Sequence, residues 1–182
     1  MRPIHGALLA ATIAVSSIAE AAPLQWTLNN VVFSDGGTAS GSFTYDASLN
    51  AYSAISITTT AGAAFGGWAY GGQAIDQPQT STQLIAAGAN SLTVPGSVLF
   101  ALRFNAALTD AGGTRNLLAG TMTIPPQGSF EVVCAVAAAC AAPPVRLVTS
   151  GSISAPVVPV PAAAVVFASA LGVMALVRRR AA

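Results

Sequence analysis

The chain contains no lysine, and its one histidine, His5, lies near the N-terminus. Catalysis by a serine or cysteine nucleophile relies on a nearby base such as histidine, and Schiff-base chemistry relies on a lysine amine. We expect His5 to be removed with an export signal, so the mature domain would have neither residue type. The sequence therefore argues against these mechanisms, and we expect a protein that is not an enzyme and that uses no cofactor.

Charged residues are also scarce, at 7% of the chain. Between residues 22 and 155, five carboxylates and three arginines leave a net charge of −2. A mildly acidic surface without basic patches does not favour phosphate contacts, so we expect no nucleic-acid partner. A carboxylate-dependent glycoside hydrolase, which needs only two acidic residues, stays open as an alternative. Its candidate residues are Asp35, Asp46, Asp76, Asp110 and Glu131.

Two of these acids, Asp35 and Asp110, are each followed closely by a glycine pair. Aspartate accepts hydrogen bonds from the backbone two residues further on, and glycine adopts turn conformations that other residues avoid. The pattern favours turn residues over calcium-binding or catalytic ones. With no histidine beside the cysteines and no second cysteine pair, the sequence predicts no metal site.

Cysteine is limited to Cys134 and Cys140. In a chain that leaves the cytoplasm, an even number of cysteines is typical of a disulfide. A bond across so short a loop would stabilise the fold by roughly 2–3 kcal/mol, because it restricts the unfolded chain. We therefore predict a disulfide between these two residues.

The first 21 residues have the pattern of a secretory signal peptide. Arg2 precedes an apolar run over residues 7–18, and the small residues Ala19 and Ala21 follow at the spacing that suits signal peptidase. Cleavage after Ala21 is therefore expected. An N-terminal membrane anchor is the alternative, and the apolar run is short for one.

Residues 156–182 form a tail of three parts: a proline-containing motif over residues 158–162, an uncharged apolar run over residues 162–177, and the cluster Arg178, Arg179 and Arg180. A helix over the run would be roughly 24 Å long, somewhat shorter than a hydrocarbon core of about 30 Å. The arginines would face the cytoplasm, which places the rest of the chain outside the inner membrane. A plain single-pass membrane anchor and a buried core helix are the alternatives.

The three parts of the tail together resemble the PEP-CTERM sorting signal of Gram-negative bacteria, and most closely its VPLPA-CTERM variant. The chain has Val160 where the variant has leucine and the main pattern has glutamate. The resemblance implies recognition and cleavage by an exosortase, a multi-spanning membrane enzyme. The recognition motif that it implies is Val158, Pro159, Pro161 and Ala162, and the cytoplasmic stop that it implies is Arg178, Arg179 and Arg180.

The same resemblance implies a route and a set of partners. Signal peptidase and an exosortase would process the two ends of the chain, and residues 162–177 would hold it in the inner membrane until then. The protein would afterwards belong to the cell surface or to an extracellular matrix, with extracellular polysaccharide as its partner there.

Residues 22–155 are predicted to form one β-rich domain. Short stretches of strand-forming residues with alternating polarity are separated by glycine-rich turns, and only residues 83–89 have a weak helical periodicity. This pattern favours an antiparallel sandwich or open barrel, flanked by an N-terminal signal helix and a C-terminal transmembrane helix. The expected strands are residues 25–33, 40–45, 52–60, 97–104, 119–124, 130–134 and 146–154.

A glycine-rich stretch over residues 61–72 interrupts this pattern and carries Phe65, Trp68 and Tyr70. If exposed together, Trp68 and Tyr70 would offer aromatic faces to a sugar ring, so a carbohydrate-binding module is an alternative function. If folded back, they would cover the end of the core, which is the interpretation that we favour. Trp26, at the start of the first strand, is expected in the core.

Overall fold

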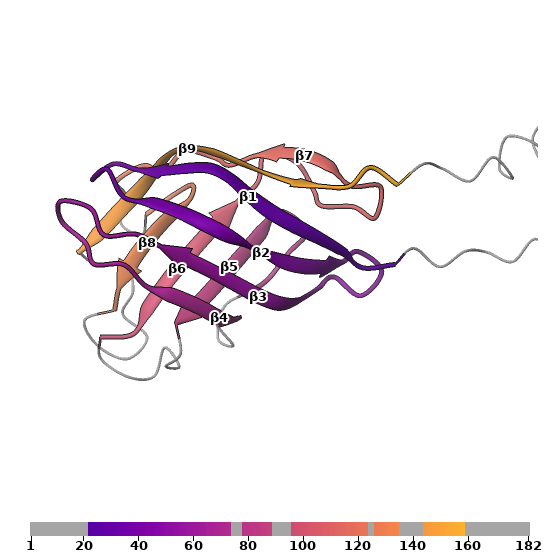
Figure 1. Cartoon of the computed structure of the whole chain (residues 1–182), viewed down its shortest axis with the longest axis horizontal. Helices are drawn as coiled ribbons and strands as arrows, with labels where there is room; N and C mark the ends of the chain where they lie inside the picture. Colours follow the sequence, from indigo (N-terminus) through magenta and orange to yellow (C-terminus); the bar gives the residue numbers. More distant parts are fainter. Residues whose placement is uncertain (1–21, 74–77, 89–95, 124–125, 135–143, 159–182) are drawn as a thin grey trace, which may run out of the picture. The chain divides into compact units, whose positions relative to one another are not determined.

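The computed structural model of the chain describes residues 22–73, 78–88, 96–123, 126–134 and 144–158 (Figure 1). Within these ranges it contains nine antiparallel strands and no helix, which confirms the all-β prediction. The two flanking helices that the sequence predicts lie outside the described residues. The strands are β1 (Leu24–Phe33), β2 (Thr38–Asp46), β3 (Ala51–Thr59), β4 (Ala69–Gln73), β5 (Gln83–Gly88), β6 (Val98–Arg103), β7 (Gly113–Asn116), β8 (Phe130–Val133) and β9 (Val145–Ala155).

Eight of the strands close into a barrel, in the order β1-β2-β3-β4-β5-β6-β8-β9. The ring is completed by antiparallel pairing of β1 with β9, in which Thr27 lies opposite Ser154 and Phe33 opposite Val148. The barrel is therefore closed, where the sequence predicted a sandwich or an open barrel. Closure gives every strand of the ring two neighbours and removes the free edges that invite aggregation.

Strand β9 is long enough to pair with two strands along its second edge. Its first residues pair with β8, where Arg146 lies opposite Glu131, and its last residues pair with β7, where Ile153 lies opposite Arg115. The stretch between β7 and β8 includes the strand expected over residues 119–124. That prediction is wrong for the described residues 119–123, of which only Thr121 pairs, in an isolated bridge with Gln127.

Strands β4, β5 and β7 were not predicted. The β5 side chains divide between two apolar surroundings, with Leu84 and Ala86 in the barrel interior and Ile85 and Ala87 in a cluster on the opposite face. A strand buried on both faces shows no alternation of polarity, so its sequence carries no period-two signal.

Aromatic side chains fill the barrel interior, and the expected core position of Trp26 is confirmed. Neighbouring ring centroids lie 4.7–6.1 Å apart, in the tilted and stacked arrangements that aromatic rings favour. An eight-stranded barrel is just wide enough for side chains to fill it. The aromatic residues that are at most 3% exposed are Trp26, Phe33, Phe43, Tyr45, Tyr52, Tyr70, Phe100 and Phe104.

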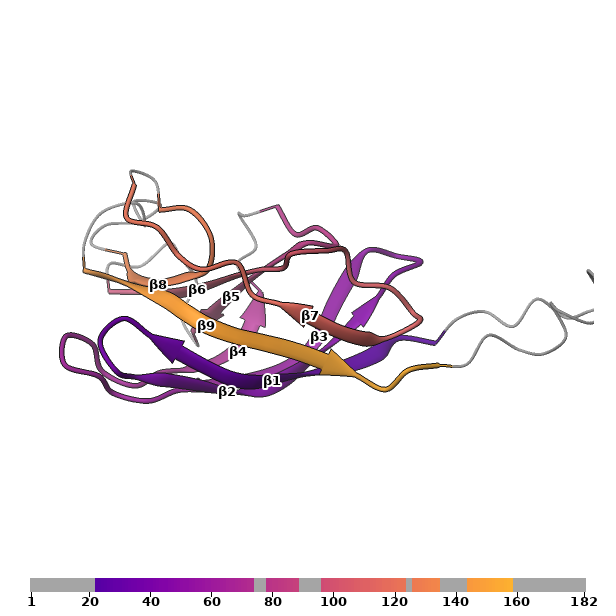
Figure 2. The same ribbon diagram turned by 90° about the horizontal axis from the view of Figure 1, so that it is seen from above.

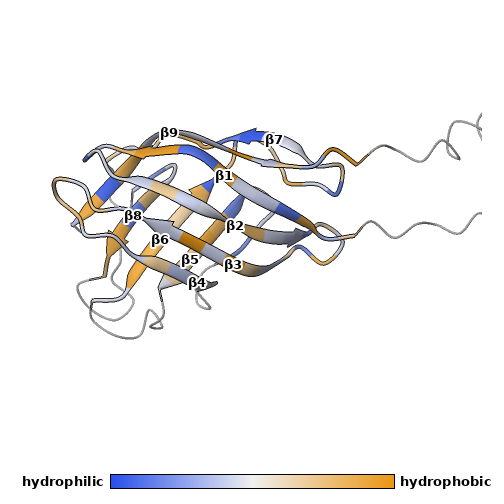
Figure 3. Ribbon diagram, viewed as in Figure 1, coloured by the Kyte–Doolittle hydropathy of each residue, from blue (hydrophilic) through white to orange (hydrophobic). Residues whose placement is uncertain are grey.

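A second apolar cluster covers the outer face of β5, β6 and β8. These strands are coloured towards the hydrophobic end of the scale along most of their length (Figure 3). Burial on both faces explains why they form the most apolar part of the barrel wall. The cluster consists of Ile85, Ala87, Leu99, Ala101, Phe130, Val132 and Cys134.

The two ends of the barrel carry different parts of the chain (Figures 1 and 2). Strand β1 begins and β9 ends at the same end, which also carries residues 47–50 and 104–112; we call it the terminal end. The opposite end carries the β1–β2 turn over residues 34–37 and the β3–β4 loop over residues 60–68; we call it the distal end.

Candidate functional site

A buried ion pair joins β8 to β9 at the distal end. The Arg146 Nε–H donates to the Glu131 carboxylate, and both residues are at most 1% exposed. Glu131 also accepts hydrogen bonds from the Thr59 hydroxyl, at 2.9 Å, and from the Tyr70 hydroxyl. A buried charge is tolerated when it is both paired and hydrogen-bonded, and Glu131 meets both conditions.

Arg146 extends this pair to the β1–β2 turn. Its Nη1–H group donates to the Thr60 carbonyl at 3.0 Å, and Nη1 lies 3.4 Å from each carboxylate oxygen of Asp35. The guanidinium carbon lies 4.0 Å from the Phe33 ring centroid and 5.3 Å from that of Phe65, within the range of a cation–π contact. We call the polar members of this group the arginine cluster: Asp35, Thr59, Tyr70, Glu131 and Arg146.

The β1–β2 turn packs closely against the guanidinium. A Cβ atom at Gly37 would overlap Nη1 of Arg146 and would approach the Thr60 carbonyl oxygen to 2.9 Å. The Gly37 N–H donates to the Asp35 carboxylate at 3.1 Å, which is the turn contact that the sequence predicts for Asp35. The Nη2 atom of Arg146 is buried and has no hydrogen-bond partner among the described residues.

The arrangement favours a structural role for the arginine cluster. It connects the β1–β2 turn with β3, β4, β8 and β9 and so ties the closing strands of the barrel to the opposite wall. Asp35 and Glu131 are the two hydrolase candidates that the structure brings together, but both bind Arg146, and Glu131 is fully buried. A glycosidase carboxylate pair must flank a substrate bond, and this pair flanks a guanidinium.

The other hydrolase candidates occupy turns or lie outside the described residues. Asp46 accepts hydrogen bonds from the backbone N–H groups of Ser48 and Leu49 and from the Ser48 hydroxyl. Asp110 lies in a turn, as predicted, but its carboxylate accepts a hydrogen bond from the distant Ala47 N–H, at 3.2 Å. Asp76 is not among the described residues.

Electrostatics within the cluster shift two pKa values in opposite directions. Burial acts to raise the pKa of Asp35, but the hydrogen bond from Gly37 and the positive charge of Arg146 outweigh it, so the pKa lies below the usual value. Burial, followed by the negative charge of Glu131, raises the pKa of Tyr70. Tyr70 therefore stays protonated, and its hydroxyl donates a hydrogen bond to the Glu131 carboxylate.

Acidification is expected to destabilise the barrel through Asp35. Its folded-state pKa lies below the unfolded value of about 3.9, so its stabilising contribution is fully present above about pH 5 and is lost as the pH falls through the folded-state pKa. Urea unfolding of the full chain across this range measures the loss. The Asp35→Asn variant should be less stable than the wild type at neutral pH and should lose less stability on acidification. Equal losses in the two proteins would contradict this role.

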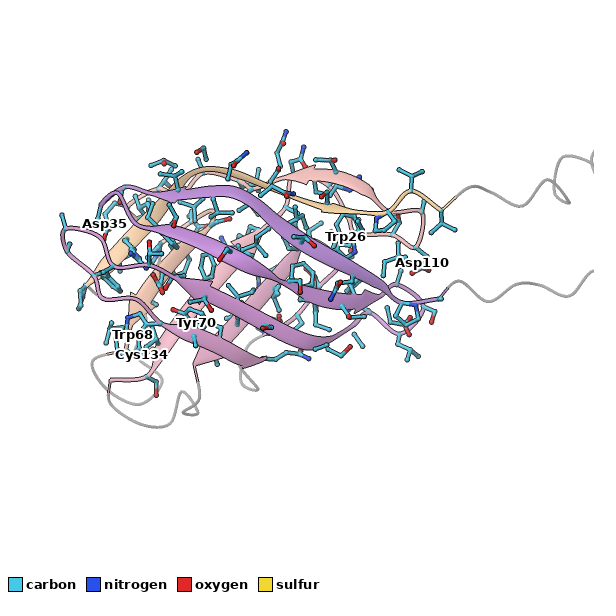
Figure 4. The ribbon with its side chains drawn as sticks, viewed as in Figure 1. Trp26, Asp35, Trp68, Tyr70, Asp110 and Cys134 are labelled. Carbon is cyan, nitrogen blue, oxygen red and sulfur yellow. The ribbon has the colours of Figure 1, made fainter. Side chains whose placement is uncertain are left out.

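The two aromatic residues that could have formed a sugar-binding face lie in the same region of the barrel (Figure 4), but they differ in burial. Tyr70 is 1% exposed and belongs to the barrel interior, which confirms the core-covering interpretation for this residue. Trp68 is 39% exposed, and its backbone N–H donates to the carbonyl and hydroxyl of Thr59. Because one ring is buried and the other half-exposed, Trp68 and Tyr70 do not form a shared platform.

Most of the predicted processing residues lie outside the described residues. Cys134 is fully buried, but its predicted partner is not described, so the disulfide stays a prediction. In the part of the chain that the structure describes, no helix is long and apolar enough to cross a membrane. Val158 is the one motif residue that is described. The predicted residues outside are Ala19, Ala21, Cys140, Pro159, Pro161, Ala162, Arg178, Arg179 and Arg180.

Sequence reasoning missed Arg146 and the hydroxyl of Thr59, and it treated Glu131 only as a catalytic candidate. A signal was present in β8, where Glu131 stands between the apolar residues Phe130 and Val132. Neighbouring side chains of a strand point to opposite faces, so an apolar outer face turns the carboxylate inward, where it needs a cation.

Comparison of the chain with protein families, curated proteins and solved structures finds no match. The function therefore has to be inferred from the residues and geometry of the chain itself.

Proposed function

We propose that this chain is an exported, non-enzymatic protein that an exosortase sorts to the cell surface or extracellular matrix of a Gram-negative bacterium. The observation that carries the proposal is the tail sequence, with its proline motif over residues 158–162, its apolar run over residues 162–177 and its terminal arginines. The signal-peptide pattern over residues 1–21 agrees with it, because an exosortase substrate must first be exported.

The geometry of the barrel supports this proposal at the terminal end. Thr27, near the start of β1, lies opposite Ser154, near the end of β9. The expected signal-peptidase site after Ala21 and the sorting motif that begins at Val158 therefore adjoin the same end of the barrel. Both ends could be trimmed without removing a barrel strand.

The interior and the distal end support the non-enzymatic part. Aromatic side chains fill the barrel, and the two carboxylates that converge are bound to Arg146. A compact, filled barrel is suited to a structural or surface-exposed role, in which its outer faces make the contacts.

The test is an intact-mass measurement of the cell-surface form from a bacterium that carries an exosortase, with an exosortase-deleted strain as reference. We expect the mature chain to begin at Ala22 and to lack the apolar run. The Pro159→Ala/Pro161→Ala variant should accumulate with its tail, because these prolines keep the motif extended. Pro78→Ala, at an exposed proline of the barrel, is the matched control and should be processed normally.

Retention of the full tail in both strains would contradict sorting and favour the single-pass anchor. A form that still carries residues 1–21 would contradict signal-peptide removal.

A further inference from the structure

The first residues after β9 are held by a turn at the terminal end of the barrel. The Val158 N–H donates to the Ala111 carbonyl at 3.1 Å. The neighbouring Gly112 has a φ of +70°, and a Cβ atom there would overlap the Pro156 carbonyl oxygen. The backbone of residues 156–158 therefore runs in direct contact with residues 111–112.

This turn is closed by a hydrogen bond of its own and is fixed to the rest of the barrel by two further contacts. The Gly112 N–H donates to the Thr109 carbonyl at 3.2 Å, and Asp110 accepts from the Ala47 N–H at 3.2 Å. Gly113 begins β7 and lies opposite Ala155, the last residue of β9. A turn held in this way can act as a rigid support for the segment that rests on it.

The side chains of the held segment remain accessible although its backbone is in contact with the turn. Val157 is 72% exposed and Val158 is 46% exposed. Proline at position 156 cannot donate to a strand ladder, which explains why β9 ends at Ala155. The segment thus leaves the barrel with a defined position and with its apolar side chains available for recognition.

We infer that residues 110–112 form a clasp that positions the tail for cleavage, so that the barrel protects the peptide bonds up to Val158 and leaves those beyond it to the processing enzyme. This inference rests on the proposed function. In the cleavage step, water adds to the carbonyl carbon of one peptide bond, which breaks to leave a carboxylate on the barrel and an amine on the released tail. A protease pairs with an extended substrate backbone, and a backbone already bound to the barrel is not free to do so.

Ala111 and Gly112 are positioning residues in this scheme, because they contact the segment before the reacting bond.

The hydrogen bond from the Val158 N–H to the Ala111 carbonyl is tested by amide exchange on the full chain in detergent micelles. We expect the Val158 amide of the wild type to exchange about fivefold more slowly than in Gly112→Ala, the factor that one net hydrogen bond supplies. Gly96→Ala is the matched control, since Gly96 also has a positive φ, of +87°, but has open space where a Cβ would lie.

Exchange of the wild-type Val158 amide at the rate of an unstructured chain would overturn the clasp, and this measurement needs no variant to fold. Equal rates in the wild type and a folded Gly112→Ala would overturn it as well.

The positioning role is tested by mapping new C-termini in an exosortase-carrying strain. In the wild type and in Gly96→Ala, every cut should fall after Val158, whereas Gly112→Ala should add cuts before it. Identical termini in all three proteins, together with a changed exchange rate, would overturn the positioning role while the proposed function stands. Absence of any cleavage in the wild type would overturn the proposed function itself.

Discussion

Replacing Arg146 with methionine should lower the free energy of unfolding of the barrel by about 3–5 kcal/mol, because it leaves a buried carboxylate without its cation. Glu131 is fully buried, so water cannot solvate its carboxylate in place of the lost Arg146 guanidinium. Asp35, in the β1–β2 turn at the distal end, would lose the same partner. Urea unfolding of the full chain in detergent solution measures the effect.

A second substitution separates the buried charge from the loss of packing. In the Arg146→Met/Glu131→Gln variant neither charge remains, and the glutamine can still accept from the Thr59 and Tyr70 hydroxyls. This double variant should be more stable than Arg146→Met alone, since breaking a buried pair costs more than replacing both of its members. If the two variants are equally stable, the uncompensated charge of Glu131 is not the cause.

Arg115→Met is the matched control for the change of arginine to methionine. Arg115 lies half-buried on β7 and donates to the carbonyls of Ala107 and Thr114 at 2.9 Å each, with no carboxylate partner among the described residues. Its replacement leaves no buried charge behind, so we expect a loss of about 1 kcal/mol.

Truncating Phe100 to alanine should also cost about 3–5 kcal/mol, here through loss of packing. Phe100 is fully buried, with its ring centroid 5.4 Å from that of Phe33 and 5.8 Å from that of Tyr70. Removing the ring would open a cavity between these two neighbours that a closed barrel has little freedom to collapse. Thermal or urea unfolding of the full chain measures the loss.

Met122→Ala is the control for this change, because Met122 is 58% exposed and its truncation should alter stability by no more than about 0.5 kcal/mol. A Phe100→Ala variant as stable as Met122→Ala would show that the interior is not packed around this ring. The barrel interior would then be a candidate ligand-binding site.

Local sequence patterns predicted the β class and several of its details. Alternation in the stretches that became β1, β2 and β3, with turn-forming residues between them, indicated antiparallel strands. The turn contact of Asp35 and the buried position of Trp26 also followed from the sequence. These features depend on residues close together in the chain or on hydrophobicity alone. The tail motif is likewise local, which is why it supports a proposal about sorting.

Closure of the ring and assembly of the arginine cluster were decided only by the tertiary structure. Arg146 contacts Asp35, which lies 111 residues away in the sequence. Likewise β1 pairs with β9, although they are the first and the last strand of the domain in chain order. The residues near each partner of such a contact indicate only that a strand can form there. Many different pairings of the same strands would be compatible with that pattern. Which edge pairs with which depends on the whole ring fitting around one set of interior side chains, with each buried charge reaching its partner.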